Sequence, residues 1–139
     1  MSRDPPIWSR SEELLRLLAD RSPFVLFRYR VRPDPGFEFV SEAARRIYGY
    51  TPSEICEDPE LLLDRLHDDD RKRFEELMER PPGEGPEGRV LRWRRRDGRL
   101  AAVSTWIVPV ESPDGNYVIE GVNREITGWG EEHDELPDV

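Results

Sequence analysis

The sequence predicts a single α+β domain, in which a five-stranded antiparallel sheet carries short helices gathered on one face. Two segments with alternating apolar and polar residues come first, short helical segments follow, and three longer alternating segments close the domain. Turn-forming sequences join the strands at both ends of this order, which favours antiparallel pairing. The length of 139 residues with 36% hydrophobic side chains suits one modest core.

An amphipathic helix is predicted over Ser9–Asp20. Ser9 and Glu12 have the spacing of a capping box, and Ser22-Pro23 ends the helix. Its apolar stripe consists of Leu14, Leu15, Leu17 and Leu18. Two roles stay open for this stripe: it covers the outer face of the sheet as a cap, or it pairs with a second copy in a homodimer. Residues 1–20 are therefore assigned to an extension with a cap or dimerisation helix.

The first two strands are predicted at Phe24–Arg32 and Phe37–Val40. In the first strand, Val25, Phe27, Tyr29 and Val31 alternate with polar residues, which indicates one buried face. Between the strands, Pro33–Gly36 combines proline and glycine in the manner of a tight turn. The two strands therefore form a hairpin.

Four short helical segments are predicted between Ser41 and Arg80. Their starts are marked by Ser41, by Thr51-Pro52, by Asp58-Pro59 and by Asp68–Asp70. Gly49 ends the first of them. The third carries Leu61, Leu62, Leu63 and Leu66, and the fourth carries a stripe of Phe74, Leu77 and Met78.

Three longer strands are predicted at Arg89–Arg96, Leu100–Glu111 and Asn116–Ile126, joined by turns at Asp97-Gly98 and at Ser112–Gly115. The first has Leu91 and Trp93 on its inner side and Arg92 and Arg94 on its outer side. Arginines on an edge strand guard against edge-to-edge aggregation, or they form a docking patch for an acidic partner or nucleic acid. Residues 128–139 read as an acidic disordered tail.

Composition narrows the classes of function. Lys and Arg number 21 against 30 Asp and Glu, a net charge of −9, which argues against nucleic acid and anionic membrane surfaces as bulk partners. No segment is apolar enough to span a bilayer, and the first residues lack the apolar stretch of a secretion signal. Cys56, the lone cysteine, offers no internal disulfide. We expect a cytoplasmic domain.

Four stretches in this order resemble the PAS domain, a sensory module of bacterial signalling proteins. They are FEFVSEAARRIYGYTPSEI, LHDDDRKRF, WRRRDGR and IEGVNREIT, and the resemblance covers about residues 10 to 127. In the second stretch Asp68 stands where the family often has proline. In the fourth, Glu125 takes the acidic position of the closing Asp-Ile-Thr.

The resemblance implies a sheet order of 2-1-5-4-3 and a pocket between the inner face of the sheet and the short helices. It places the PAS-like domain at residues 21–127. It also implies ligand sensing, dimerisation and relay to an effector outside this chain, such as a kinase, cyclase or transcription module.

The residues for several cofactor chemistries are missing. Where flavin-binding relatives carry a reactive cysteine, this chain has Glu60, so flavin–thiol photochemistry is disfavoured, and Cys56 is expected to pack as a small hydrophobic side chain. Lys72–Glu79 holds no histidine for haem, and His67 is expected to cap or pack. The acids at Asp68–Asp70 suit a helix N-terminus better than a cation site. No nucleophile motif or phosphate loop occurs, so the domain is not expected to be an enzyme.

Nine residues are our candidates for the pocket wall: Phe27, Phe39, Ile47, Tyr48, Leu62, Leu66, Trp93, Trp106 and Asn123. Such a wall favours an apolar or aromatic guest with few polar anchors. By resemblance to flavin-sensing relatives, Asn123 points into the pocket, and its buried amide needs a partner. That partner is a bound ligand, or it is a polar neighbour such as Tyr29, Tyr48 or Ser104.

The leading hypothesis is thus a non-enzymatic PAS sensor that binds a small molecule or dimerises. A ligand-free protein-interaction module acting in trans is the alternative, and a small α+β barrel enzyme is a weaker third reading. The identity of a ligand or cofactor stays open.

Overall fold

The computed structural model describes residues 7–81, 83–111, 113–130 and 136–139. Five strands form one antiparallel sheet in the order β2-β1-β5-β4-β3, as expected. The strands are β1 (Val25–Arg32), β2 (Gly36–Val40), β3 (Glu87–Arg94), β4 (Leu100–Glu111) and β5 (Tyr117–Glu125). The chain therefore has the predicted α+β architecture, with the first and last strands side by side in the middle of the sheet.

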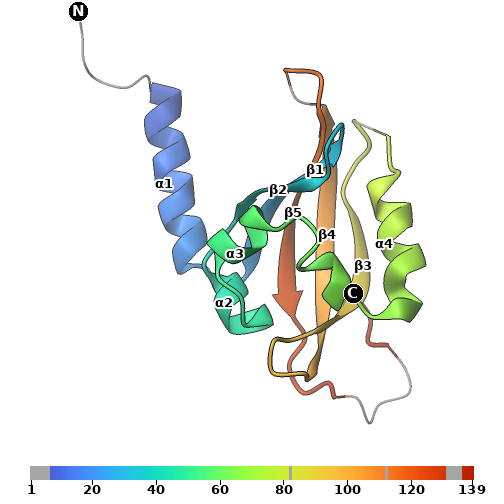
Figure 1. Cartoon of the computed structure of the whole chain (residues 1–139). Helices are drawn as coiled ribbons and strands as arrows, with labels where there is room; N and C mark the ends of the chain where they lie inside the picture. Colours follow the sequence, from blue (N-terminus) through green and yellow to red (C-terminus); the bar gives the residue numbers. More distant parts are fainter. Residues whose placement is uncertain (1–6, 82, 112, 131–135) are drawn as a thin grey trace, which may run out of the picture.

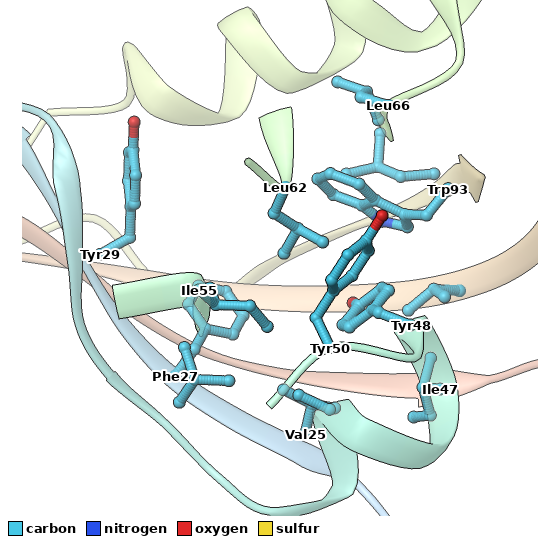
Figure 2. Close-up of a cluster of buried hydrophobic side chains, with 14 of the residues drawn as sticks. Val25, Phe27, Tyr29, Ile47, Tyr48, Tyr50, Ile55, Leu62, Leu66 and Trp93 are labelled. Carbon is cyan, nitrogen blue, oxygen red and sulfur yellow. The ribbon is translucent and has the colours of Figure 1, made fainter. Parts of the chain in front are cut away.

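Short helices lie on one face of this sheet (Figure 1). They are α2 (Ala43–Tyr48), α3 (Pro52–Glu57) and α4 (Arg71–Met78), with 3-10 turns η1 (Leu63–Arg65) and η2 (Asp68–Asp70) between α3 and α4. Thr51 starts α3 with a full capping box to Glu54, and Gly49 ends α2 at a φ of 87°. The core lies between these helices and the inner face of the sheet (Figure 2).

The third helical segment of the prediction is wrong. Residues from Asp58 to Leu66 form turns and η1 instead of a regular helix. Of its four leucines, Leu62 and Leu66 are buried in the core, whereas Leu61 and Leu63 pack only partly against it. An irregular path suits this segment because it must also bring Leu66 alongside β3. There Leu66 forms an isolated antiparallel bridge with Trp93.

The N-terminal helix α1 (Ile7–Arg21) extends away from the sheet and helices (Figure 1). Leu14, Leu17 and Leu18 are each more than half exposed, and Ala19 is buried. The side chains of Leu15 and of the expected capping box lie outside the described residues. The three described leucines of the stripe are thus not buried against the sheet, whereas Arg16 of the same helix lies over the Phe39 ring on the outer side; the role of α1 as a cap or dimerisation helix stays a prediction.

Two further observations concern the C-terminal residues and the length of the helices. Residues 131–135 of the predicted tail lie outside the described part, and residues 136–139 have no regular secondary structure. Val139 comes close to Gly88 on β3, with 2.8 Å between its Cγ1 atom and the place of a Cβ on that glycine. Among the described residues, no helix is long and apolar enough to cross a membrane.

Candidate functional site

A cavity of about 30 Å³ lies between the inner face of the sheet and α4. Its wall combines residues from all five strands with Leu62 and three residues of α4: Phe27, Tyr29, Phe37, Leu62, Phe74, Leu77, Met78, Leu91, Trp93, Thr105, Ile107 and Asn123. The aromatic rings contact one another along the wall, with centroids 4.8 Å apart for Tyr29 and Phe37 and 6.5 Å apart for Phe74 and Trp93. The sheet and α4 thus form a mostly apolar pocket in which five of the twelve wall residues are aromatic.

Four of the nine predicted wall residues line this cavity: Phe27, Leu62, Trp93 and Asn123. Ile47, Tyr48 and Leu66 are buried in the same core but lie outside the cavity lining. Tyr48 lies next to two wall residues: its ring centre is 5.8 Å from that of Trp93 (Figure 2). Its hydroxyl also accepts a hydrogen bond from Asn123. The sequence therefore locates the right region of the sheet but not the boundary of the cavity.

Phe39 is a wrong assignment, and a β-bulge explains it. Residues opposite each other in a sheet share a face, and the register sets Val40 against Phe27 but Phe37 against Tyr29. The register shift between these pairs leaves Glu38 as the extra residue, so Phe37 and Val40 both face inward. Phe39 pairs with Arg28 on the outer side, where the Arg16 guanidinium lies 5.4 Å from its ring centre.

Trp106 is the second wrong assignment. Thr105 pairs with Asn123 on the inner face, so its neighbour Trp106 must point to the outer face, where it is 45% exposed. Val108 on the same side is also exposed, whereas Thr105 and Ile107 line the cavity. Because side chains alternate with a period of two, an error of one residue exchanges the two faces.

The wall residues that sequence reasoning missed come from α4 and from the inner faces of the strands. Phe74, Leu77 and Met78 were recognised as an apolar helical stripe but not as pocket residues. The signal was present, because a stripe on a short helix next to the sheet must face the sheet. Tyr29, Leu91, Thr105 and Ile107 follow from the strand alternation once the inner face is known.

Asn123 lies at a polar part of the wall and is 6% exposed. Its Nδ2 group donates to the Tyr48 hydroxyl over 2.7 Å, so one of the expected polar partners is present. Burial raises the pKa of Tyr48 well above its usual value, and the tyrosine stays neutral at any physiological pH. Three other polar atoms of wall residues have no hydrogen-bond partner among the described residues: Asn123 Oδ1, Thr105 Oγ1 and Trp93 Nε1.

A second polar centre fastens the segment before α4 to the edge of the sheet. The Asp70 carboxylate is completely buried and accepts hydrogen bonds from the Arg92 backbone, from its Nε and Nη2 groups and from Arg73. His67 N donates to the carbonyl of Arg92 over 2.9 Å. The edge of β3 is therefore partly covered, and Arg92 is mostly buried in an ion pair. By its register Arg92 pairs with Ala102 on the outer side of the sheet, as expected, but its guanidinium is taken up by the ion pair with Asp70 and is not free to form a docking patch.

The residues that were candidates for cofactor chemistry have structural roles or lie at the surface. Cys56 is partly buried and packs against the core, as expected, and burial raises the pKa of its thiol. His67 precedes η2, where its Nδ1 atom accepts from the Asp69 backbone, which confirms its capping role. Glu60 is exposed. Within the described ranges no three His, Cys, Asp or Glu side chains form a group that could hold a metal ion.

The fold agrees with that of known proteins. A family model described as the PAS fold matches residues 37–123. No curated protein matches the sequence. The PAS domain of an HTR-like protein from Haloarcula marismortui has a TM-score of 0.67 at 16% identity, over 85% of this chain and 99% of that chain.

Two other solved structures are similar. The LOV protein of Rhodobacter sphaeroides has a TM-score of 0.66 at 20% identity, over 88% of this chain and 70% of that chain. A PAS domain from a two-component sensor histidine kinase has a TM-score of 0.62 at 15% identity, over 86% and 99%. Such identities show a shared fold, and the family model covers more than half of the sequence. The chain therefore belongs to the PAS fold family.

Proposed function

We propose that this chain is a sensory signalling domain that takes a small molecule into the cavity beneath α4 and relays its presence to an effector. The observation that carries the proposal is the cavity itself, whose aromatic wall includes three buried polar atoms without partners among the described residues. Buried polar groups in native proteins are nearly always hydrogen-bonded. Their lack of protein partners at this place supports a guest that supplies them.

Flavin and haem do not fit this site. The volume of about 30 Å³ is far below the roughly 300 Å³ at which drug-sized pockets begin. The described wall holds no histidine or cysteine, and Glu60 carries a carboxylate where a flavin thiol would stand. The proposed function therefore uses no covalent or metal chemistry in this domain, and it is sensory and not catalytic.

The arrangement of β5 supports a path from the cavity to the rest of the protein. Asn123 lines the cavity, and two residues later Glu125 forms an ion pair with Arg95 beyond the end of β3. A guest that moves Asn123 would thus act on the strand that leaves the domain. A kinase, cyclase or transcription module is the proposed effector, and one structural neighbour is a PAS domain of a two-component sensor histidine kinase.

Dimerisation is the other part of the proposal. Leu14, Leu17 and Leu18 lie 57–58% exposed on α1, and such a stripe is a poor surface for a monomer. Pairing of α1 with the same helix of a second copy would bury it. The acidic net charge of −9 gives this domain no general attraction for nucleic acid or membrane surfaces.

A ligand-free interaction module is the second candidate. The observation in its favour is the exposed outer face of β4, where Trp106 and Val108 offer apolar surface to a protein partner, together with the small size of the cavity. In this case the cavity is only a packing gap, and the outer face carries the function.

Native mass spectrometry of the full chain, purified without organic additives, separates these functions. The sensor proposal expects a retained small-molecule mass that disappears on denaturation. A Leu77→Phe variant, which enlarges a wall residue, should retain less of it, and a Val108→Thr control on the outer face should retain as much as the wild type. Protein mass alone from every preparation, with no thermal stabilisation by any compound in a small-molecule library, would favour the interaction module.

A further inference from the structure

Three partnerless polar groups define what the cavity can accept. Asn123, Thr105 and Trp93 all line it, and each is at most 6% exposed. The free atoms are an amide oxygen that accepts, a hydroxyl that donates or accepts, and an indole N–H that only donates. A guest that satisfies them needs both a donor and an acceptor.

The strand pairing fixes the relative positions of two of these residues, Asn123 and Thr105. They are directly opposite each other on β5 and β4, which places their Cβ atoms about 4.5–5.5 Å apart on the inner face. The amide is held by Tyr48, and whichever way it is turned, one of its two polar atoms remains for the cavity. A hydroxyl group suits either orientation because it can donate and accept.

Charge limits the guest as well. None of the described wall residues is charged, so an ion in the cavity would have no counter-charge and would lose its hydration. Carboxylates, phosphates and ammonium groups are therefore excluded from this wall by their desolvation cost. The guest is neutral.

Volume limits its size. One water molecule needs about 10–15 Å³ of such space, so the 30 Å³ available correspond to two or three water-sized places. A molecule with two to four non-hydrogen atoms fills them. Met78 and Phe74, at the partly buried rim on α4, can adjust to its shape, since methionine in particular is conformationally adaptable.

We infer that the cavity binds a small neutral alcohol, with its hydroxyl at Asn123 and Thr105 and its carbon atoms against the aromatic wall. The inference rests on the proposed sensory function and names the chemical class of its ligand.

The experiment compares two probes of four non-hydrogen atoms each, 2-propanol and acetone, on the ¹⁵N-labelled full chain. Both accept hydrogen bonds, but only 2-propanol also donates one. The indole N–H signal of Trp93 is assigned by the Trp93→Phe variant among the four tryptophans of the chain. We expect 2-propanol to shift the Trp93 signal and the Thr105 and Asn123 amides saturably, at concentrations at least tenfold lower than acetone.

Matched variants test the placement of the hydroxyl. Thr105→Val should weaken the response to 2-propanol about tenfold, and Thr105→Ser should restore it. Ser104→Ala is the control, because the Ser104 hydroxyl is also buried and without a partner among the described residues but lies on the outer side of the same strand. This variant should respond like the wild type.

Equal responses to both probes, or shifts that never saturate, overturn the inference. If those results accompany a larger retained molecule in native mass spectrometry, the sensory function stands and only the alcohol assignment fails. If neither probe binds and no molecule is retained, both fail.

Discussion

Asp70 is expected to contribute more to stability than any other acidic residue described in this chain. Its carboxylate has no exposed surface and accepts from Arg92 N at 2.7 Å, Arg92 Nε at 3.0 Å and Arg92 Nη2 at 2.8 Å, in addition to Arg73. These contacts join the segment before α4 to the edge of β3. Substituting Asp70→Asn keeps the shape of the side chain but removes its charge and one acceptor oxygen.

The magnitude follows from the bonds that are lost. The two carboxylate oxygens divide the contacts, with the Arg92 backbone and Nε on Oδ2 and with Arg92 Nη2 and Arg73 on Oδ1. An asparagine can satisfy only one of these two sets and places an N–H₂ group against the other. Hydrogen bonds to charged groups contribute about 1.5–3 kcal/mol each, so the loss of two gives about 3–6 kcal/mol. Breaking a buried ion pair typically costs about 3–5 kcal/mol, which agrees with this range.

The effect depends on pH in a definite direction. Burial alone would raise the pKa of Asp70, but the hydrogen bonds and charges of Arg92 and Arg73 outweigh it and hold the pKa below its usual value. A carboxyl with a lowered pKa in the folded state stabilises the fold above its unfolded pKa of about 3.9 and loses this contribution as pH falls through the folded value. The difference between wild type and Asp70→Asn should therefore be full at pH 7 and shrink below about pH 4.

Urea unfolding followed by tryptophan fluorescence, at pH 7 and at steps down to pH 3, measures this difference. Asp68→Asn is the matched control, since Asp68 belongs to the same turn but is 94% exposed and forms only a surface pair with Arg71. The control should change stability by less than about 0.5 kcal/mol. A loss below 1 kcal/mol for Asp70→Asn at pH 7, or a loss that does not depend on pH, would refute the network described above.

Other changes test other parts of the structure. Gly121→Ala should lose about 1–3 kcal/mol in urea unfolding, because its Cβ would lie 2.6 Å from both the Phe27 ring and a backbone oxygen, whereas Gly85→Ala has no neighbour within 4 Å and should be neutral; equal effects would contradict the packing. Tyr48→Phe should lose about 1–3 kcal/mol by leaving the Asn123 amide without its partner, and an unchanged midpoint would contradict that bond. Replacing the three exposed leucines of α1 by serine should turn a dimer into a monomer in light scattering, and a wild-type monomer would refute the dimer. The purified protein should be colourless, and a flavin or haem absorption band after expression with those cofactors would show that the cavity opens far more than described.

The sequence predicted the fold well because the signals for each helix and strand are local and several of them agree. Alternation in β1, the glycine after α2 and the hairpin at Asp97-Gly98 each specify their own element. The order of the strands came from the resemblance to the PAS family and was confirmed. The segment from Asp58 to Leu66 was wrongly predicted as a helix because four closely spaced leucines are typical of a helix. Their spacing does not show that the chain must bring Leu66 next to Trp93 on β3.

The candidate site was harder to foresee because it depends on which face each side chain takes. Glu38 adds one residue to β2 and thereby exchanges the places of Phe37 and Phe39, and no local pattern announces such a bulge. Trp106 and Thr105 are neighbours on a strand that is apolar on both sides, so size alone suggested the wrong one. The Asp70–Arg92 pair joins residues 22 positions apart, and only the three-dimensional fold brings them together.

A crystal structure of the full chain at high resolution tests the central claim most directly, through the electron density in the cavity between Asn123, Thr105 and Trp93. The account predicts density for a non-protein molecule larger than water, within hydrogen-bond distance of the Asn123 amide and the Thr105 hydroxyl. An empty cavity, one filled by water alone, or one closed by rotation of the two side chains onto each other would contradict it.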